Sequence, residues 1–418
     1  MKESKWYVGI DWGTEEHAVC LVADDGKVVG QRTFPHSGKG IATLVDWLLE
    51  KTSAHPSEIL VAIETPHGAV VETLLERRML VHSINPKQLD RFRDRFTVAG
   101  AKDDARDAQV LADSLRTDQK CFRVVAVDDP KVIELREWSR LHDELTEERV
   151  RLGNRVREQL LRYYPQILSL TDDVAAGWFL ELWELMPSPK AARTARQKRV
   201  LMLLREHRIR RVDVEHVMQT LREKPLVVAP GTTEAATAHI ASLVERIRIV
   251  NRQLKDTDRR IEQLTEELAT RESDPGQTCE QRDVAVLRSL PGVGRIVLAT
   301  LLTEASRPLR ERDYHALRAL FGVAPVTKRT GKQGKPGGSP PIILMRHACN
   351  HRLRNAAHNW GGIAIQRDPK SRAVYAALRA RGHSHARALR TIVDRLLVVA
   401  CAMLRAGCPF EPRRRLAA

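Results

Sequence analysis

Tyr7-Val8-Gly9-Ile10-Asp11-Trp12-Gly13-Thr14 is an apolar strand that ends in a carboxylate and a glycine turn. Two more strand patterns follow at 17–22 and 28–34, with the turn Asp24-Asp25-Gly26 between them. Asp-Gly between alternating segments is a strong hairpin signal, so 6–34 is predicted to be an antiparallel β-meander.

The segment after the meander alternates between helix and strand patterns. A helical pattern at 38–52 leads to Ile59-Leu60-Val61-Ala62-Ile63-Glu64, an apolar run suited to a strand buried on both faces. A helix at about 68–79, a strand at 80–84 and a helix from about 87 come next. Hairpin strands followed by β-α-β units are the order expected of a ribonuclease-H-like α/β domain, which we place at 1–129.

Four acids stand at the edges of these elements. Asp11 and Glu64 end apolar strands, while Asp104 and Asp107 open a helix on which their spacing puts both side chains on one face. Mg²⁺ prefers hard oxygen ligands, and a pair of such ions can hold the attacking and leaving oxygens of a phosphodiester. The acids therefore predict a Mg²⁺ site for phosphodiester chemistry.

Each of these signals also has a simpler interpretation. Asp103 and Asp104 could merely cap a helix N-terminus, where the helix dipole favours acids. The string from Gly9 to Thr14 is also similar to a phosphate-binding turn of actin-like sugar kinases, but no second glycine-rich phosphate loop or adenosine pocket follows it. Unpaired carboxylates at the ends of apolar strands would be costly, which favours catalysis for the four acids together.

Residues 130–280 have a different pattern, that of long charged helices. Apolar residues in 233–270 recur in alternating steps of three and four, which is typical of a coiled-coil seam, with a polar interruption at Thr257. Val132–Tyr164 is a second amphipathic helix, so we expect an antiparallel all-α stalk with a helical insertion at about 166–230. The seam could be a spacer or could close a dimer, and we favour the dimer. The tryptophans Trp138, Trp178, Trp183 and Trp360 are expected to pack between helices.

The third region, 281–418, is mainly helical and rich in cations. The segment from Leu287 to Gly294 is similar to a helix-hairpin-helix turn, whose glycines let backbone N–H groups approach a phosphate. A loop rich in Lys, Gly and Pro spans 326–341, and the later helices have few acids to balance their arginines, which favours a nucleic-acid surface. The residues predicted to contact nucleic acid are Lys102, Gly292, Gly294, Arg295, Lys328, Arg329, Gly331, Lys332, Lys335, Arg352, Arg354, Arg381 and Arg387.

Bulk composition agrees with a polyanionic partner. The 418 residues include 69 Lys and Arg against 53 Asp and Glu, which gives a net charge of +16 and a pI near 9.9. No apolar run reaches the roughly 18 residues that a membrane helix needs, so no membrane association is expected. The six cysteines show no zinc-site spacing, and the N-terminus shows no signal region, so we expect a cytoplasmic protein with reduced thiols.

Two blocks of motifs resemble one family. Gly9-Ile10-Asp11, Glu64 and the string from Lys102 to Ala108 look like the DEDD motif of the Piv-like insertion-sequence transposases, the RNA-guided bridge recombinases. The strings that resemble this family's second domain are Leu290–Gly294, Phe321–Thr327, Ala348-Cys349-Asn350, Arg352–Asn355 and Arg381–His385. The blocks stand in the family's order at the two ends of the chain, while the middle shares only helical character.

The resemblance implies a RuvC-like first domain that binds Mg²⁺ through Asp11, Glu64, Asp104 and Asp107. It also implies a C-terminal serine that attacks DNA, and the covalent intermediate conserves phosphodiester energy until a new 3′-end attacks. This chain has Thr330-Gly331 where the family has Ser-Gly, and the extra methyl group restricts the rotamers of threonine. Thr330 is the candidate nucleophile and Ser339 the second choice. Alternatively, the loop only grips the phosphate backbone.

The implied function is that of a DNA transposase or recombinase in a prokaryotic cytoplasm, associated with the nucleoid. It would join donor and target double-stranded DNA under the guidance of a structured RNA encoded by its own element, with sequence read by base pairing. Recombining two duplexes needs several active sites, so we expect a homo-oligomer, a dimer or tetramer. The resemblance further implies that catalytic domains of different chains combine in one site. Two alternatives stay open: a RuvC-like structure-specific endonuclease that uses metal-activated water, and a nucleic-acid-binding scaffold without catalysis.

Overall fold

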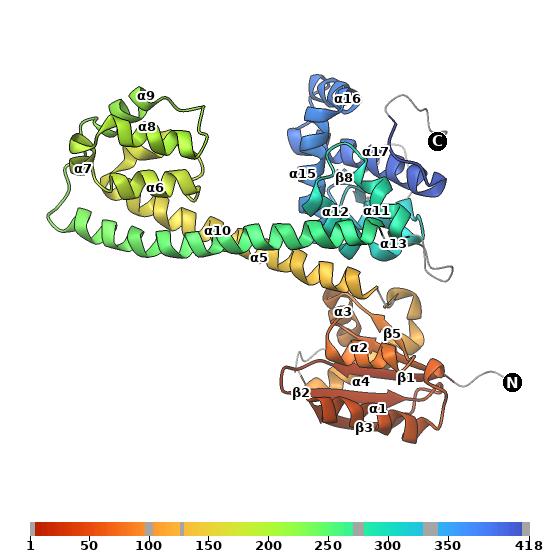
Figure 1. Cartoon of the computed structure of the whole chain (residues 1–418). Helices are drawn as coiled ribbons and strands as arrows, with labels where there is room; N and C mark the ends of the chain where they lie inside the picture. Colours follow the sequence, from red (N-terminus) through yellow and green to blue (C-terminus); the bar gives the residue numbers. More distant parts are fainter. Residues whose placement is uncertain (1–4, 97–102, 126–128, 271–279, 329–341, 412–418) are drawn as a thin grey trace, which may run out of the picture. The chain divides into compact units, whose positions relative to one another are not determined.

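The computed structural model describes residues 5–96, 103–125, 129–270, 280–328 and 342–411 (Figure 1). The chain divides into two compact units, Met1–Asp128 and Asp129–Ala418. The second is mainly helical. No helix in the described ranges is both long and apolar enough to cross a membrane.

The first unit is built on a six-stranded mixed sheet in the order β3-β2-β1-β4-β5-β6. The neighbours β1 (Trp6–Asp11), β2 (Glu16–Val22) and β3 (Val28–Pro35) are antiparallel, which confirms the predicted meander. On the other side of β1, β4 (Ile59–Ile63) and β5 (Leu80–Ser83) run parallel to it, and β6 (Arg123–Val124) is antiparallel to β5. This mixed sheet is compatible with a ribonuclease-H-like domain.

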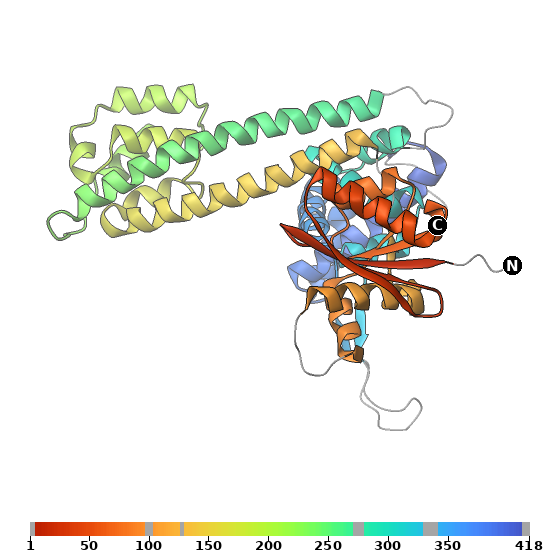
Figure 2. The same cartoon turned by 90° about the horizontal axis from the view of Figure 1, so that it is seen from below.

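Helices cover the sheet on its two faces (Figure 2). The helices α1 (Gly38–Thr52) and α2 (Ala69–Glu76) share one apolar core with Val8 and Ile10 of β1, and α4 (Asp104–Thr117) shares the other with Tyr7. A further helix, α3 (Pro86–Phe96), lies against α4. The chain can bring α4 close to β1 because Gly9 has no side chain, since a Cβ there would lie 1.9 Å from the carbonyl oxygen of Ala108. This close approach sets the position of the acids on α4.

Two long helices, α5 (Pro130–Tyr163) and α10 (Thr232–Thr270), lie side by side in the second unit (Figures 1 and 2). They are antiparallel, since Lys131 bonds to Glu267 at 2.7 Å while Arg149 bonds to Asn251 at 2.8 Å. The predicted seam residues that are buried within the chain are Ile240, Leu243, Ile247, Val250, Thr257, Ile261, Leu264 and Leu268. The seam is therefore covered inside one chain, which corrects our expectation that it closes a dimer. A coiled-coil supercoil stays a prediction.

Between these helices the chain folds into a helical insertion. It consists of η3 (Pro165–Leu170), α6 (Gly177–Leu185), α7 (Pro189–Thr194), α8 (Gln197–Glu206) and α9 (Val214–Leu221). Their apolar side chains form one core with parts of α5 and α10. Trp178 and Trp183 are buried there, as predicted for packing residues, and the Trp183 indole donates to the Tyr163 hydroxyl at 3.1 Å.

The C-terminal part of this unit packs around Trp360, which is fully buried and donates from its indole to the Pro291 carbonyl at 3.0 Å. Val132 of α5 and Leu264 of α10 belong to the same core, so the C-terminal helices and one end of the long pair form one body. The cysteines that the structure describes are free thiols. The elements are α11 (Glu280–Arg288), α12 (Arg295–Glu304), α13 (Ser306–Arg310), α14 (Tyr314–Leu320), β7 (Val326–Lys328), β8 (Ile342–Leu344), α15 (His351–Arg367), α16 (Pro369–Ala380) and α17 (His385–Ala406).

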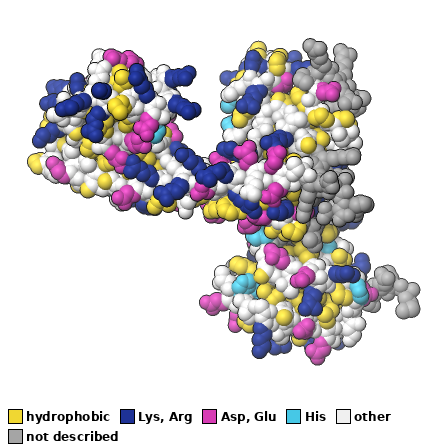
Figure 3. Space-filling view, in the orientation of Figure 1, with side chains coloured by type: hydrophobic (Ala, Val, Ile, Leu, Met, Phe, Trp, Pro, Cys, Tyr) yellow, Lys and Arg dark blue, Asp and Glu magenta, His cyan; other side chains and the backbone are white. Residues whose placement is uncertain are grey.

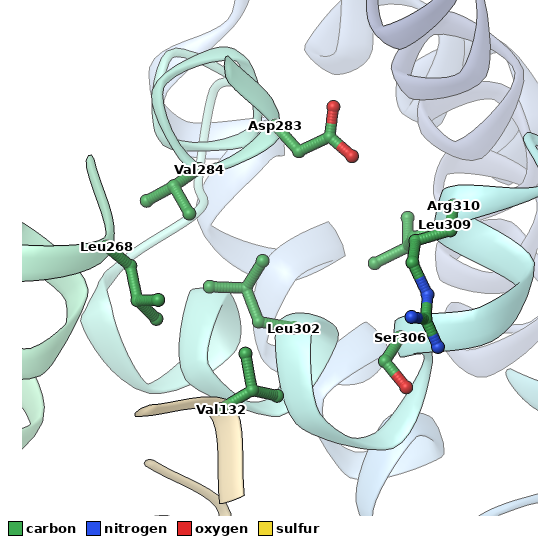
Figure 4. Close-up of a pocket in the computed structure, with 8 residues that line it drawn as sticks. All are labelled: Val132, Leu268, Asp283, Val284, Leu302, Ser306, Leu309 and Arg310. Atoms are coloured by element: carbon green, nitrogen blue, oxygen red, sulfur yellow. The ribbon is translucent and has the colours of Figure 1, made fainter. Parts of the chain in front are cut away.

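A small pocket lies where α5, α10, α11, α12 and α13 meet (Figure 4). The buried Asp283 at its edge accepts two bonds from the Arg312 guanidinium, at 2.6 and 2.7 Å, so its charge is already paired. The remaining lining is mostly apolar and consists of Val132, Leu268, Val284, Leu302, Ser306, Leu309 and Arg310. We regard this pocket as a gap in helix packing.

Candidate active site

Asp11 and Glu64 are placed together by the sheet register. β1 and β4 are parallel neighbours in which Ile10 faces Ile63, and the two acids are the next residues along each strand. Because the carboxyl ends of parallel neighbours reach the same edge of a sheet, the two carboxylates lie at one edge. Each is half-buried.

The other two acids come from the first turn of α4. Asp103 is the N-cap and accepts a hydrogen bond from the Ala105 N–H at 3.3 Å. The capping interpretation therefore applies to Asp103, while Asp104 and Asp107 lie in the first turn, where the helix dipole also favours acids. Asp104 is exposed, whereas Asp107 is only 3% exposed. A buried carboxylate at the start of a helix needs a partner of positive charge.

The pKa of Asp11 is raised by its surroundings, which include the other three acids. Burial of Asp11 raises its pKa, and the negative charges of Asp107, Asp104 and Glu64 raise it further, to about 6. The nearby Arg93 guanidinium partly opposes this rise. Like charges that raise the pKa of a carboxylate in this way favour a bound cation over separate anions.

Arg93 of α3 is the cation that the structure places among these acids. Its guanidinium makes a bidentate pair with Asp107, at 2.8 Å from Nε to Oδ1 and 2.9 Å from Nη2 to Oδ2. It also bonds to Asp90 at 2.6 Å. Arg93 could not be predicted from the sequence, because nothing in its neighbourhood along the chain marks it as different from the other arginines of α3.

The donor atoms of the four acids, though not their spacing in the structure, suit a hard divalent cation. Within the described ranges, no group of three or more His, Cys, Asp or Glu side chains is close enough together to hold a metal ion as it stands. The carboxylates of Asp11, Glu64, Asp104 and Asp107 are oxygen donors of the kind that Mg²⁺ prefers, and their mutual repulsion would fall on binding it. Arg93 marks the position as one that accepts positive charge.

The turn after Asp11 is fixed by two histidines that the sequence analysis also missed. The Gly13 N–H donates to His17 Nδ1 at 3.4 Å, which places the His17 proton on Nε2, 2.9 Å from His36 Nδ1. His17 is fully buried, and burial lowers its pKa, so the ring is held neutral. The exposed ring of Trp12 lies next to both histidines. This network holds the backbone just beyond Asp11.

The helix-hairpin-helix-like turn has a packing role that we did not predict. Gly292 has a positive φ of 86°, and a Cβ there would lie 2.7 Å from the Ala364 backbone nitrogen of α15. Gly294 is the N-cap of α12 and faces open space. Arg295 was predicted to contact nucleic acid, but its guanidinium pairs with Asp258 at 2.8 Å and Glu262 at 3.3 Å of α10.

Arg352 is also engaged within the chain. Its guanidinium bonds to Asp143 and Ser139 of α5, both at 2.7 Å, and to Glu304 of α12 at 2.6 Å. All three bonds tie α15 to the helices around it, and the predicted role of Arg352 in nucleic-acid binding stays a prediction. Arg354 is half-buried and bonds to His351 at 3.0 Å.

Two of the predicted contact residues do present free charge. Arg381 at the end of α16 and Arg387 in the first turn of α17 are exposed, and neither forms an ion pair within the described ranges. Lys328 ends β7, which pairs antiparallel with β8 through Val326 and Leu344. The loop between the two strands carries the nucleophile candidates. Lys102, Arg329, Thr330, Gly331, Lys332, Lys335 and Ser339 lie outside the described residues.

Comparisons with known proteins match the chain at its two ends. A transposase family model matches residues 8–165, and a model described as the transposase IS116/IS110/IS902 family matches residues 284–376. The first segment contains the four acids, and the second contains the turn at Gly292 and the loop with Thr330. Together the two segments make up more than half of the chain.

Similar proteins are found in two bacterial genera. "Putative transposase y4uE" of Sinorhizobium fredii is 55% identical over 208 residues, which are 50% of this chain and 58% of that protein. "Mini-circle putative transposase for IS117" of Streptomyces coelicolor is 28% identical over 399 residues, 94% of this chain and 92% of the relative. An uncharacterised 44.8 kDa protein of insertion element IS116 from Streptomyces clavuligerus is 26% identical over 419 residues, 98% of this chain and 97% of the relative.

The two family models stand in the order that the sequence motifs predict, and the four acids of the first motif lie within the first matched segment. The chain belongs to the IS116/IS110/IS902 family of insertion-element transposases.

Proposed function

We propose that this protein cuts and joins DNA strands at a Mg²⁺ site formed by Asp11, Glu64, Asp104 and Asp107. The observation that carries the proposal is the sheet register, which brings Asp11 and Glu64 to one edge of the sheet, while Asp104 and Asp107 lie in the first turn of α4. The raised pKa of Asp11, caused by burial and then by the charges of the other three acids against the opposing charge of Arg93, agrees with this arrangement. A group of carboxylates that repel one another is costly in an isolated chain and becomes favourable when a divalent cation binds.

Bound Mg²⁺ would polarise a phosphodiester and stabilise the negative charge that develops on it. The chain's own residues set the conditions for this. The close contact of α4 with Gly9 fixes the helix that carries Asp104 and Asp107 against β1. Arg93 holds both oxygens of Asp107, so its guanidinium must release at least one of them when a metal ion takes its place.

The second part of the proposal is a covalent intermediate at Thr330, with Ser339 as the second choice. The Thr330 hydroxyl would lose its proton and attack phosphorus, forming an Oγ–P bond while the P–O3′ bond breaks and leaves a free 3′-hydroxyl. A 3′-hydroxyl of the other DNA would then attack the same phosphorus and release the threonine. The joining step needs no external energy source, because one ester bond is exchanged for another.

The third part concerns partners. We propose that donor and target duplexes are selected by pairing with a structured RNA from the same element, and that the protein acts as a homo-oligomer at the nucleoid in the cytoplasm. The resemblance to bridge recombinases supports the RNA, and a net charge of +16 supports a nucleic-acid partner of either kind. Since the seam of α10 is covered within the chain, an oligomer has to use another surface.

One assay tests these parts together. Purified full-length protein with its co-purified RNA is incubated with Mg²⁺ and labelled donor and target DNA, and the products are resolved on denaturing gels. We expect joined DNA and a protein-linked strand with the wild type, neither with Asp11→Asn, and no linked strand with Thr330→Ala.

Three results would contradict the proposal in different ways. Free 5′-phosphate ends without any protein-linked strand would indicate a structure-specific endonuclease that uses water. A linked strand that persists in Thr330→Ala would remove this residue as the nucleophile, and Ser339→Ala would then be the next variant. Joining by Asp11→Asn at the wild-type rate would refute the metal site.

A further inference from the structure

The helical insertion carries a strongly basic surface that the proposed chemistry does not use. Between residues 185 and 205 the sequence has no Asp or Glu and six Lys or Arg. All six are exposed on α7, on α8 or between them, and Figure 3 shows the dark-blue side chains gathered over this part of the molecule. We call this surface the α7–α8 patch; it consists of Lys190, Arg193, Arg196, Lys198, Arg199 and Arg205.

The charge of the patch is not neutralised by the insertion itself. None of its cations forms an ion pair within the described ranges, whereas Glu184 of α6 pairs with Arg248 of α10 at 2.6 Å. Cations elsewhere in this unit are used differently, as in the pairs of Arg295 with Asp258 and of Arg352 with Asp143. The α7–α8 patch therefore groups six exposed cations that form no ion pair within the described ranges.

The position of three patch cations is unfavourable for the helix that carries them. Arg196 is the N-cap of α8 and makes no side-chain cap, and Lys198 and Arg199 lie in the first turn, which holds no acid. The N-terminal end of a helix carries partial positive charge, so cations there are destabilising unless an anion binds. Stability alone would favour acids at these positions.

The patch is also held in a fixed shape. Arg222 donates from its guanidinium to the carbonyl oxygens of Ala192 and Ala195, at 3.3 and 3.0 Å. These bonds fix the end of α7 and hence its junction with α8. A rigid surface loses little conformational entropy when it binds a partner.

We propose that the α7–α8 patch binds the phosphate backbone of duplex DNA. A duplex is favoured over a single strand because the patch offers no aromatic ring for base stacking, and Trp178 and Trp183 of the insertion are buried. DNA is favoured because the chain belongs to a transposase family, and the insertion lies between the two segments that match the family models. The patch adds a sequence-independent grip on DNA to the proposed function.

The test measures the binding of the full-length protein to a short labelled DNA duplex by fluorescence anisotropy. EDTA is present so that no strand is cut. The variant replaces Arg196, Lys198 and Arg199 by glutamine. We expect about a tenfold loss of affinity at low salt and a salt dependence that is shallower by about 2 to 3 in log–log slope, since each phosphate contact contributes about 0.9. The double variant Arg196→Lys and Arg199→Lys keeps both positive charges and should bind the duplex like the wild type.

A matched control removes the same charge from another exposed surface, by Arg252→Gln, Lys255→Gln and Arg259→Gln on α10. It should change the affinity less than twofold. Equal losses in the two triple variants, or no loss in the α8 variant, would overturn the proposal. So would a loss confined to single-stranded DNA or to an RNA duplex, tested in parallel. Asp11→Asn should bind the duplex normally while failing to join DNA, so the patch and the metal site can fail separately.

Discussion

The sheet edge of the first unit and the α7–α8 patch of the second are groups of like charge that the molecule treats differently. At the sheet edge, Asp107 is almost fully buried and the chain supplies Arg93 as its partner. On α7 and α8 the cations are exposed and have no acidic partner within the described ranges. Water screens the exposed charges and cannot screen the buried one, so only the buried group needs an internal counter-ion.

The difference in burial and pairing indicates which kind of ligand each group of charges binds. A set of oxygen donors around the buried Asp107 suits a small divalent cation, because such an ion can replace the guanidinium there. An open row of cations suits an extended polyanion whose phosphates follow one another along a surface. The two groups therefore predict two ligands and two independent ways to disable the protein.

The largest effect is expected from Asp11→Asn at the sheet edge. Joined DNA should fall at least about a thousandfold, because metal stabilisation of a phosphodiester transition state is worth several kcal/mol. The measurement is the rate of product formation on denaturing gels. A fall of less than tenfold would show that Asp11 is not essential.

The stability of Asp11→Asn in the absence of metal tests the repulsion between the acids at the sheet edge. The pKa of Asp11 is raised to about 6, so the fold favours its protonated form and loses stability as pH rises and the group ionises. In EDTA at neutral pH, Asp11→Asn should therefore unfold at a higher temperature than the wild type. A lower unfolding temperature would mean that the ionised Asp11 is stabilised by its surroundings.

Arg93→Gln should have the next largest effect. In EDTA it should lower the free energy of unfolding by about 3 kcal/mol, because the buried Asp107 loses its counter-ion. Mg²⁺ should restore part of this loss and raise the unfolding temperature of the variant more than that of the wild type. The control on the same helix is Arg95→Gln, whose pair with Asp118 is exposed and should matter little. If Mg²⁺ raised the unfolding temperatures of Arg93→Gln and Arg95→Gln equally, Arg93 would not be part of the metal site.

A pH titration should detect the histidine network beside Asp11. Burial lowers the pKa of His17, so the folded protein holds the ring neutral while the unfolded chain protonates it near pH 6.5. The stability from this network should be complete above that pH and be lost as the pH falls below it. His17→Asn should flatten the pH dependence of the unfolding temperature, and the exposed His315→Asn should leave it unchanged. An unchanged pH profile in His17→Asn would contradict the proposed tautomer.

The smallest effect is expected from Arg199→Glu in the first turn of α8. It places an acid where the helix dipole favours one, so chemical denaturation should show a gain of about 0.5 kcal/mol in stability. Duplex DNA binding should weaken at the same time. Arg199→Gln should lie between the variant and the wild type in both measurements. A loss of stability in Arg199→Glu would mean that Arg199 does not destabilise α8.

The sequence predicted the parts of the fold that depend on local pattern. Apolar runs and an Asp-Gly turn predicted the strands around Asp11, and a three-four periodicity predicted the buried face of α10. Local pattern could not say what covers that face, and the partner is α5 of the same chain. The four acids were predicted from their places at element ends, and the coupling around Asp11 agrees with them.

Charge partners distant in the sequence were the part that could not be predicted. Arg352 is an ordinary cation of a basic helix until the fold brings it to Asp143, 209 residues away along the chain. Arg93 and His17 were missed for the same reason, because their roles depend on Asp107 and His36. Composition gives the amount of charge, and the fold decides which charges remain free for a ligand.

The most direct test of the central claim is a titration of the full-length protein with Mn²⁺. The electron paramagnetic resonance signal of the free ion measures how much Mn²⁺ the protein has bound. The account predicts saturable binding in the wild type and its loss in Asp11→Asn and in Asp107→Asn. Asp103→Asn should bind normally, because asparagine can keep the helix cap and Asp103 is not one of the four acids. Wild-type Mn²⁺ uptake by Asp11→Asn and Asp107→Asn would contradict the account.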